Sequence, residues 1–389
     1  MPRKWNFQLP TQIEFGRGCV RRLGTMVKPF GGSALLVGYA DRTGMEQAYT
    51  RAARALADCH IEVHEFFEVL PDPDVALIEK GAVVASEARA EMVIGFGGGS
   101  VIDAAKGIAT LAEMGGCLWD YMPINPDSRA VAAALPIIAV PTTAGSGAEV
   151  TAVAVFTHYA AEGRLAQTAP ASSSRTCLKA SIVGPAIRPK LALVDPDLAS
   201  GSPARLTAAC GADALGHAIE ACMSRNDNPI ATTLATRAAT LIFENLPLAV
   251  DNPEDPKPRE PLALAATLAG SAFDSAGVTV AHSIAHALGS ILHIPHGEAV
   301  SIATPPSLRF NTENSPHAPF SADRVAELFG RVGLPDRAEA APGAVADNAS
   351  QDLAERLAEN AIVSTPVPIK LNPRKITREQ LVGLIKEML

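Results

Sequence analysis

Short apolar runs alternate with helix-periodic runs through the first half of the chain. The apolar runs predict buried strands, and the runs between them place apolar residues at the spacing of an amphipathic helix. Strands are expected at residues 12–15, 33–38, 61–67 and 92–96, and helices at 44–57, 74–88 and 101–112. Strands that alternate with helices pair in parallel, with helices covering both faces of the sheet. The first half therefore predicts an α/β domain.

The pattern changes near residue 195. Beyond Pro196 the chain consists of long Ala- and Leu-rich runs at helical spacing, with few β-branched clusters. Helices are expected at residues 204–224, 230–246, 261–273 and 278–292, and surface loops at the Pro-containing segments 252–261 and 337–346. We therefore predict an α/β domain over residues 1–195 and an all-helical domain over residues 196–389.

The composition of the chain argues against several classes of binding partner and location. The 389 residues are 48% hydrophobic with a mean hydropathy of +0.15, which indicates a well-buried soluble protein. The net charge of −8 argues against nucleic acid or an anionic membrane as a partner. Six widely spaced cysteines without a CxxC pair are typical of reduced thiols in the cytoplasm. The first residues lack the apolar core of a signal peptide, and the apolar segment 261–281 is expected to be a core helix because Asp274 interrupts it.

Histidines concentrate in one apolar stretch of the helical half. Four of the nine lie between residues 281 and 297, namely His282, His286, His293 and His296. A single histidine of this kind is commonly a core residue bonded to a backbone carbonyl, but four in so short a stretch favour a metal site. His296 follows Pro295 and is expected in a turn.

A carboxylate and another histidine lie upstream at matching spacing. Asp213 and His217 are four residues apart, so on a helix they share a face, as His282 and His286 also do. A carboxylate oxygen with imidazole nitrogens suits Fe²⁺ or Zn²⁺ rather than Ca²⁺ or Mg²⁺. Spacing alone leaves open which of the histidines bind the ion.

A run of glycines joins the strand expected at 92–96 to the next helix. In Gly97–Ser100, accessible backbone amides and a helix N-terminus suit a phosphate, with Ser100 as the N-cap. The run departs from the usual dinucleotide fingerprint because Ser100 stands where a third glycine is expected. A purely structural turn is the alternative. Asp103 and Lys106, one turn on, either face the nucleotide or are ordinary helix-surface charges.

Two further polar features follow expected strands. The segment AVPTTAGSGAEVT supplies hydroxyl groups from Thr142, Thr143 and Ser146, which suit ribose, pyrophosphate or the nicotinamide carboxamide. A Ser/Thr/Gly turn that satisfies its own hydrogen bonds is the alternative. Asp41, after the second strand, can accept both ribose hydroxyls of an adenosine and would repel a 2′-phosphate, which favours NAD over NADP. The alternative for Asp41 is a helix N-cap.

Five motifs occur in the order typical of one enzyme family. They are GGGSVIDAAKGIA, PTTAGSGAEVT, VDPDLA, GADALGHAIEA and AHSIAHALGSILHIPHGEAV, and NPRKITREQL is similar to the family's last helix. Over essentially its whole length the chain resembles the iron-dependent (group III) alcohol dehydrogenases. The resemblance implies an N-terminal dinucleotide-binding α/β domain and an all-helical C-terminal domain in a dehydroquinate-synthase-like architecture, with the metal and hydride-transfer site in the cleft between them.

The resemblance also implies a role for each matching residue. The metal ligands carry over to Asp213, His217, His282 and His296, and His286 carries over as a proton relay or positioning residue. His293 matches no functional position of the family. The implied cofactor-binding residues are Gly97, Gly98, Gly99, Ser100 and Asp103 at the pyrophosphate, Thr142, Thr143 and Ser146 at the nucleotide, and Lys179 on the ribose side.

The implied reaction interconverts a small alcohol with its aldehyde or ketone and uses NAD, or else NADP, as the hydride carrier. The implied metal is Fe²⁺ with Zn²⁺ as the alternative, and the implied assembly is a homodimer or a multiple of one. A dehydroquinate-synthase-like or glycerol-dehydrogenase-like enzyme and a non-catalytic nucleotide-binding homologue are the alternatives. The synthase-like enzymes need several Lys and Arg around a polyanionic substrate, whereas the pocket segments here are nearly free of Arg. Loss of a metal ligand would favour the non-catalytic homologue, and none is lost.

Overall fold

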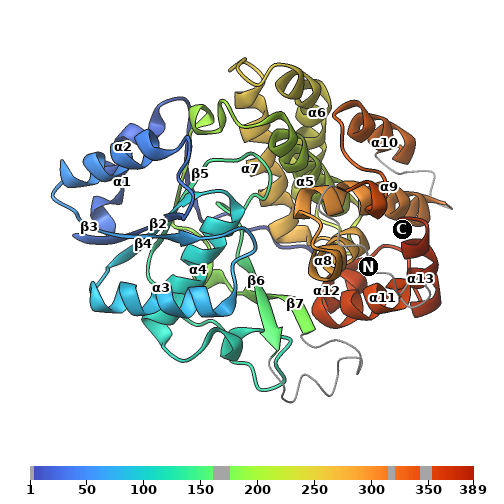
Figure 1. Ribbon diagram of the computed structural model, residues 1–389, viewed down its shortest axis with the longest axis horizontal. Helices are drawn as coiled ribbons and strands as arrows, with labels where there is room; N and C mark the ends of the chain where they lie inside the picture. Colours follow the sequence, from blue (N-terminus) through green and yellow to red (C-terminus); the bar gives the residue numbers. More distant parts are fainter. Residues whose placement is uncertain (1–3, 161–175, 314–319, 342–352) are drawn as a thin grey trace. The chain divides into compact units, whose positions relative to one another are not determined.

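The computed structural model describes residues 4–160, 176–313, 320–341 and 353–389 (Figure 1). These residues form two compact units. The sheet unit comprises Leu9–His158 and Ala180–Ser200, and the helical unit comprises the described residues of Met1–Gln8, Tyr159–Lys179 and Gly201–Leu389. The units are therefore not two consecutive stretches of chain, because two short segments of the first half group with the second.

A six-stranded sheet organises the sheet unit. Its strands lie in the order β1-β8-β5-β4-β2-β3, and all of their pairings are parallel. The strands are β1 (Gln12–Phe15), β2 (Ser33–Tyr39), β3 (Glu62–Val69), β4 (Met92–Gly97), β5 (Ile137–Pro141) and β8 (Leu191–Val194). A separate two-stranded sheet pairs β6 (Val153–Ala160) with β7 (Thr176–Val183). The four strands expected from apolar runs are confirmed.

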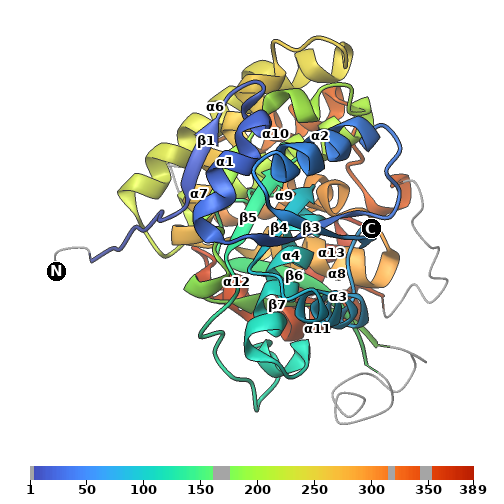
Figure 2. The same cartoon turned by 90° about the vertical axis from the view of Figure 1, so that its left-hand side faces the viewer.

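Helices cover both faces of the six-stranded sheet, as Figure 1 and Figure 2 show. One face packs against α1 (Leu23–Val27) and α2 (Glu46–Ala57), and the other packs against α3 (Val75–Glu87) and α4 (Gly99–Met114). Along β2, Ala34 and Leu36 join the first core while Leu35 and Val37 join the second. Because both faces are buried along the central strands β2, β4 and β5, these strands are nearly continuous apolar runs, whereas the edge strands β1 and β3 contain several polar residues. The predicted α/β domain with a covered parallel sheet is confirmed.

The helical unit contains nine α-helices among the residues that the structure describes. They are α5 (Ala204–Met223), α6 (Pro229–Asp251), α7 (Arg259–Ala276), α8 (Val280–Leu292), α9 (His296–Thr312), α10 (Ala322–Arg331), α11 (Leu353–Ser364), α12 (Pro366–Leu371) and α13 (Arg378–Lys386). The four helices expected from Ala- and Leu-rich runs correspond to α5–α8 and are confirmed. The loop expected at 252–261 ends early because α7 begins at Arg259, and the loop expected at 337–346 extends outside the described residues.

The structure bears on two expectations from the sequence, one about the cysteines and one about the apolar segment 261–281. All six cysteines are free, as their spacing predicts. Within the described residues, no single helix is long and apolar enough to cross a membrane, and only α7 and α8 meet such a test together, as a pair bent by 107°.

Candidate active site

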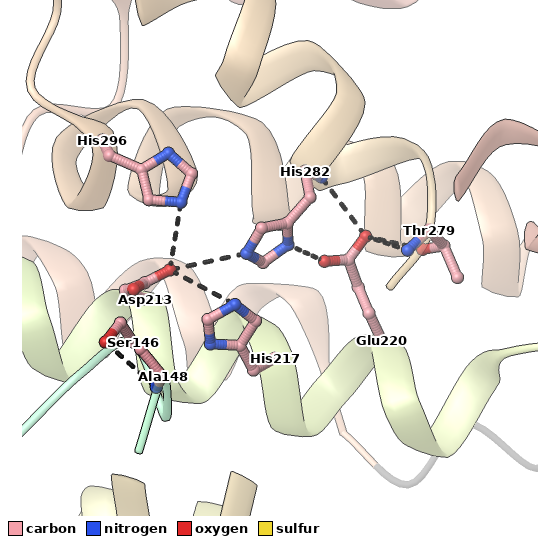
Figure 3. Close-up of polar contacts among 8 residues, drawn as sticks. All are labelled: Ser146, Ala148, Asp213, His217, Glu220, Thr279, His282 and His296. Atoms are coloured by element: carbon pink, nitrogen blue, oxygen red, sulfur yellow. Dashed lines mark hydrogen bonds and ion pairs between the residues drawn. The ribbon is translucent and has the colours of Figure 1, made fainter. Parts of the chain in front are cut away.

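Three helices of the helical unit bring the expected metal ligands together (Figure 3). Asp213 and His217 lie one turn apart on α5, His282 lies in the first turn of α8, and His296 is the first residue of α9. The Nε2 atoms of His282 and His296 each lie 3.4 Å from Asp213 Oδ1, and Nε2 of His217 lies 3.7 Å from it. The expected turn at His296 is wrong, because Pro295 serves as the N-cap of α9 and His296 is already the first residue of that helix.

Some polar atoms at this point have no hydrogen-bond partner among the described residues, although the three rings lie within ion-pair distance of Asp213. Asp213 Oδ1 and His282 Nε2 are buried and have no hydrogen-bond partner among the described residues. Burying such an atom unpaired costs on the order of 1–3 kcal/mol. Ligand atoms of Asp213, His217 and His282 all lie within 4.8 Å of one another, so one cation can satisfy them together. An oxygen-and-imidazole set of this kind fits Fe²⁺ or Zn²⁺.

Glu220, which the sequence pattern did not single out, holds His282 from the side away from Asp213 (Figure 3). Its Oε2 contacts His282 Nδ1. Its Oε1 accepts hydrogen bonds from Thr279 N at 2.9 Å, from Thr279 Oγ1 at 2.7 Å and from His282 N at 3.3 Å. Glu220 and Asp213 lie on the same face of α5, two helical turns apart, and this spacing was the available signal.

Burial and neighbouring charges set the protonation of these residues. Burial would raise the pKa of Asp213, but the His217 and His296 rings hold it well below its usual range. Burial would also raise the pKa of Glu220, yet the His282 ring keeps that pKa lowered. Burial lowers the pKa of His217 to about 4, and it would lower the pKa of His282 too, but Glu220 and Asp213 raise that pKa to about 10. Asp213 and Glu220 are therefore ionised, and without an ion the His282 ring between them is protonated, so a cation bound at its Nε2 would displace that proton.

His286 lies one turn beyond His282 on α8, beside His296. The ring centroids of His286 and His296 are 5.3 Å apart, and His286 Nδ1 is buried with no partner among the described residues. Burial, together with His296 and Lys179, holds the pKa of His286 well below its usual range, so its ring is neutral. His293 ends α8 in the left-handed conformation, with φ of 57°.

The glycine run of the sheet unit leads from β4 directly into α4. Gly98, not Ser100, is the N-cap of α4, which corrects the expected cap. Gly98 is extended, and its carbonyl already accepts hydrogen bonds from Val101 N and Ile102 N, so this single residue separates the end of β4 from the start of α4. Ser100 therefore lies within the first turn, where its Oγ accepts a hydrogen bond from Asp72 N at 3.4 Å.

Side chains from neighbouring strand ends crowd this run. A Cβ added at Gly98 would lie 2.8 Å from the Tyr39 hydroxyl and 3.2 Å from Thr143 Oγ1, and one added at Gly99 would lie 2.7 Å from Ser146 Oγ. Tyr39 ends β2, while Thr143 and Ser146 follow β5. The carboxyl ends of parallel strands are where open α/β sheets bind nucleotides. The crowded glycines therefore fit a close-approaching phosphate group.

Asp103 and Lys106 are not ordinary surface charges. Asp103 Oδ2 accepts a hydrogen bond from Val155 N at 2.9 Å, and the fully buried Lys106 donates to Val153 O at 2.7 Å. Both side chains thus connect α4 to β6. Thr142, also buried, lies directly after β5 and donates its N–H to Gly97 O at 3.0 Å.

Asp41 and Lys179 differ in their surroundings. Asp41 is exposed and accepts a hydrogen bond from Thr43 N at 3.0 Å, and the hydrogen bonds from Thr43 lower its pKa. Because α2 has Met45 as its N-cap, Asp41 does not cap that helix. Lys179 is buried on β7 and reaches α8, where a Cβ added at Gly289 would lie 3.1 Å from its Nζ.

Comparisons with known proteins show the family to which this fold belongs. Residues 10–196 match the family model of the iron-containing alcohol dehydrogenases, and residues 207–389 match that of the C-terminal region of the Fe-containing alcohol dehydrogenase family. The chain is 32% identical to the NAD-dependent methanol dehydrogenase of Bacillus methanolicus, over 99% of this chain and 100% of that protein. It is 34% identical to the 1,3-propanediol dehydrogenase of Citrobacter freundii, over 88% and 85%.

A solved structure extends the likeness to the whole fold. The sulfoacetaldehyde reductase of Bifidobacterium kashiwanohense in complex with NAD+ matches with a TM-score of 0.82 at 27% identity, over 99% of each chain. The family models together span nearly all of the sequence. The chain therefore belongs to the iron-containing alcohol dehydrogenase family, and it is an oxidoreductase that interconverts alcohols with aldehydes or ketones.

Proposed function

We propose that the chain is an iron-dependent, NAD-linked dehydrogenase of small neutral alcohols, with Asp213, His217, His282 and His296 as the metal ligands. The observation that supports this best is the convergence of three Nε2 atoms, at 3.4 to 3.7 Å, on Oδ1 of Asp213, a buried oxygen with no hydrogen-bond partner among the described residues. Family membership favours Fe²⁺ over Zn²⁺, which the same ligand chemistry admits. The NAD-dependent relative and the NAD-bound solved structure favour NAD over NADP.

Side chains of the protein orient the proposed metal ligands and provide the proposed proton relay. When bound, the ion supplies Lewis acidity toward an alcohol hydroxyl and the nicotinamide supplies a hydride acceptor. Asp213 Oδ1 faces Nε2 of His282, which would hold the ion with the other ligands, and Glu220 holds the opposite side of that ring. His286 is neutral, so it can accept a proton at one ring nitrogen and release one from the other without becoming charged. We assign His286 the proton relay or positioning role.

The glycine run is the proposed dinucleotide site. Its supporting observation is the cradle at Gly98 and Gly99, where an added Cβ would meet a neighbouring side chain within 3 Å. We assign the pyrophosphate to Gly97, Gly98, Gly99 and Ser100 with Asp103, and the nucleotide to Thr142, Thr143 and Ser146. We assign the ribose hydroxyls of the adenosine to Asp41 and place Lys179 on the ribose side of the cofactor.

The location, assembly, domain limits and substrate class of the enzyme are also proposals. We infer a cytoplasmic location from the free cysteines, and a homodimer or a multiple of one from the family resemblance. We retain residues 1–195 and 196–389 as the cofactor-binding and metal-binding halves. The net charge of −8 and the apolar pocket segments support a small neutral substrate rather than a polyanionic one.

A screen of alcohols tests the proposal. Protein stripped of metal, then reconstituted with Fe²⁺ or with Zn²⁺, is assayed with NAD and with NADP. We expect turnover of a small alcohol with NAD in the iron-loaded protein and none in the stripped protein. Full activity in verified metal-free protein would contradict the metal assignment, and activity limited to polyanionic substrates would favour the synthase-like alternative.

A further inference from the structure

Glu220 is a buried carboxylate whose two oxygens meet different groups. The residue is only 3% exposed. One oxygen accepts hydrogen bonds from the N–H groups of Thr279 and His282 and from the Thr279 hydroxyl, while the other contacts the His282 ring (Figure 3). Thr279 is the N-cap of α8, and the first N–H groups of a helix have no partner within the helix. Glu220 therefore supplies from α5 the cap that α8 lacks in its own sequence.

The same carboxylate determines which nitrogen of His282 carries the proton. An ionised carboxylate only accepts hydrogen bonds, so His282 Nδ1 must donate to it. In the neutral ring the lone pair then lies on Nε2, which is the atom 3.4 Å from Asp213 Oδ1. We propose that Glu220 is a positioning residue that fixes His282 in the Nδ1–H tautomer and so presents Nε2 to the metal. This inference rests on the proposed metal site.

Charge balance supports the same role. Asp213 and Glu220 are both buried residues of α5, and their carboxylates lie on opposite sides of the His282 ring. Their two negative charges match one divalent cation when the histidines are neutral. A carboxylate behind a ligating histidine also makes the ring a more basic ligand.

A glutamine side chain at position 220 cannot accept hydrogen bonds both from the N–H groups of Thr279 and His282 and from His282 Nδ1. The N–H groups of Thr279 and His282 need an acceptor, so the amide oxygen of a Glu220→Gln variant must face them. The amide NH₂ then faces His282 Nδ1 and requires a lone pair there. The ring proton moves to Nε2, where it blocks the metal. Reversing the amide would instead place NH₂ against two backbone donors.

Metal titration tests the inference. Metal-stripped wild type, Glu220→Gln and Thr279→Val are titrated with Co²⁺ in competition with a chelator, and the visible absorption of Co²⁺ reports its ligands. We expect Glu220→Gln to bind Co²⁺ about 10- to 100-fold more weakly. Thr279→Val keeps the shape of the side chain and loses only the hydroxyl bond to Oε1, so its affinity should equal that of wild type. Equal affinity of wild type and Glu220→Gln, or an equal loss in both variants, overturns the inference.

A measurement on wild type keeps the inference testable when a variant does not fold. In zinc-loaded protein with ¹⁵N-labelled histidine, NMR should show His282 protonated at Nδ1 and bound through Nε2. The reversed assignment overturns the role of Glu220. Failure of wild type to bind Co²⁺ contradicts the proposed metal site itself. Normal wild-type binding with an unaffected Glu220→Gln variant contradicts only the role of Glu220.

Discussion

The metal site and the glycine run are built in opposite ways. At the metal site, side chains from α5, α8 and α9 converge on one unpaired oxygen, so the chemistry depends on which side chains are present. At the glycine run, an added Cβ would lie within 3 Å of Tyr39 or Ser146, so the chemistry depends on side chains being absent. Removing one group should therefore destroy the first site, whereas adding one methyl group should disturb the second.

The largest effect is expected from the loss of a ligand. His282→Ala removes one of four proposed ligands, leaves Glu220 as a buried charge without its ring partner, and leaves Asp213 with two of its three rings. Losing a residue that only supports a metal ligand lowers metal affinity by up to about 100-fold. We expect the loss of a ligand itself to lower the affinity by more than that, and activity to fall with it. Metal analysis after dialysis and an alcohol assay on the same sample check this. An active His282→Ala variant with bound iron contradicts the ligand assignment.

His286→Ala should separate chemistry from metal binding. Because His286 is a proposed relay and not a ligand, the variant should retain metal at wild-type stoichiometry. Turnover should fall by about 10²- to 10⁴-fold, the usual contribution of a positioned acid–base group, and its pH dependence should change. Steady-state rates across pH, with metal analysis, provide the measurement. A metal content near zero would instead identify His286 as a ligand.

Adding a methyl group to the glycine run should weaken the cofactor and spare the metal. In Gly99→Ala the new Cβ would lie 2.7 Å from Ser146 Oγ, so the loop after β5 must move. We expect KM for NAD to rise about tenfold, which corresponds to about 1.4 kcal/mol, with unchanged metal content. Gly383→Ala on α13 is the matched control, since nothing lies within 4 Å of its Cβ. Equal KM values in the two variants contradict the cofactor assignment.

The smallest effect is expected at Asp41. Asp41 is exposed and already bonded to Thr43 N, so its influence on a 2′-phosphate acts through a solvated carboxylate. Asp41→Gly should raise kcat/KM with NADP several-fold and leave metal content unchanged. Kinetics with both cofactors, for wild type and variant, measure the ratio. An unchanged ratio of kcat/KM for NADP to that for NAD would contradict the role of Asp41 in cofactor choice and leave it only its hydrogen bond from Thr43 N.

Local patterns in the sequence predicted much of the fold and the metal set. The apolar runs at β2 and β4 became strands because both faces of the sheet are buried there, and Asp213 and His217 share a face because four residues make about one helical turn. α9 was harder to predict, because Pro305 and Pro306 lie inside it and prolines usually break a helix.

Long-range partners account for what the sequence did not reveal. Glu220 acquires its role from His282, 62 residues away, and its spacing from Asp213 shows only that the two carboxylates share a face of α5, not which ring lies between them. Lys106 is fully buried because β6 supplies an acceptor at Val153, 47 residues away. The choice of His282 over His286 as a ligand also came from the family resemblance, since spacing allowed either.

Anomalous diffraction from crystals of the iron-loaded protein, recorded at the iron absorption edge, tests the central claim most directly. The account predicts one ion per chain, bound by a carboxylate oxygen of Asp213 and by Nε2 of His217, His282 and His296. An ion bound by His286, an ion elsewhere in the chain, or no ion at fully reconstituted stoichiometry would contradict it.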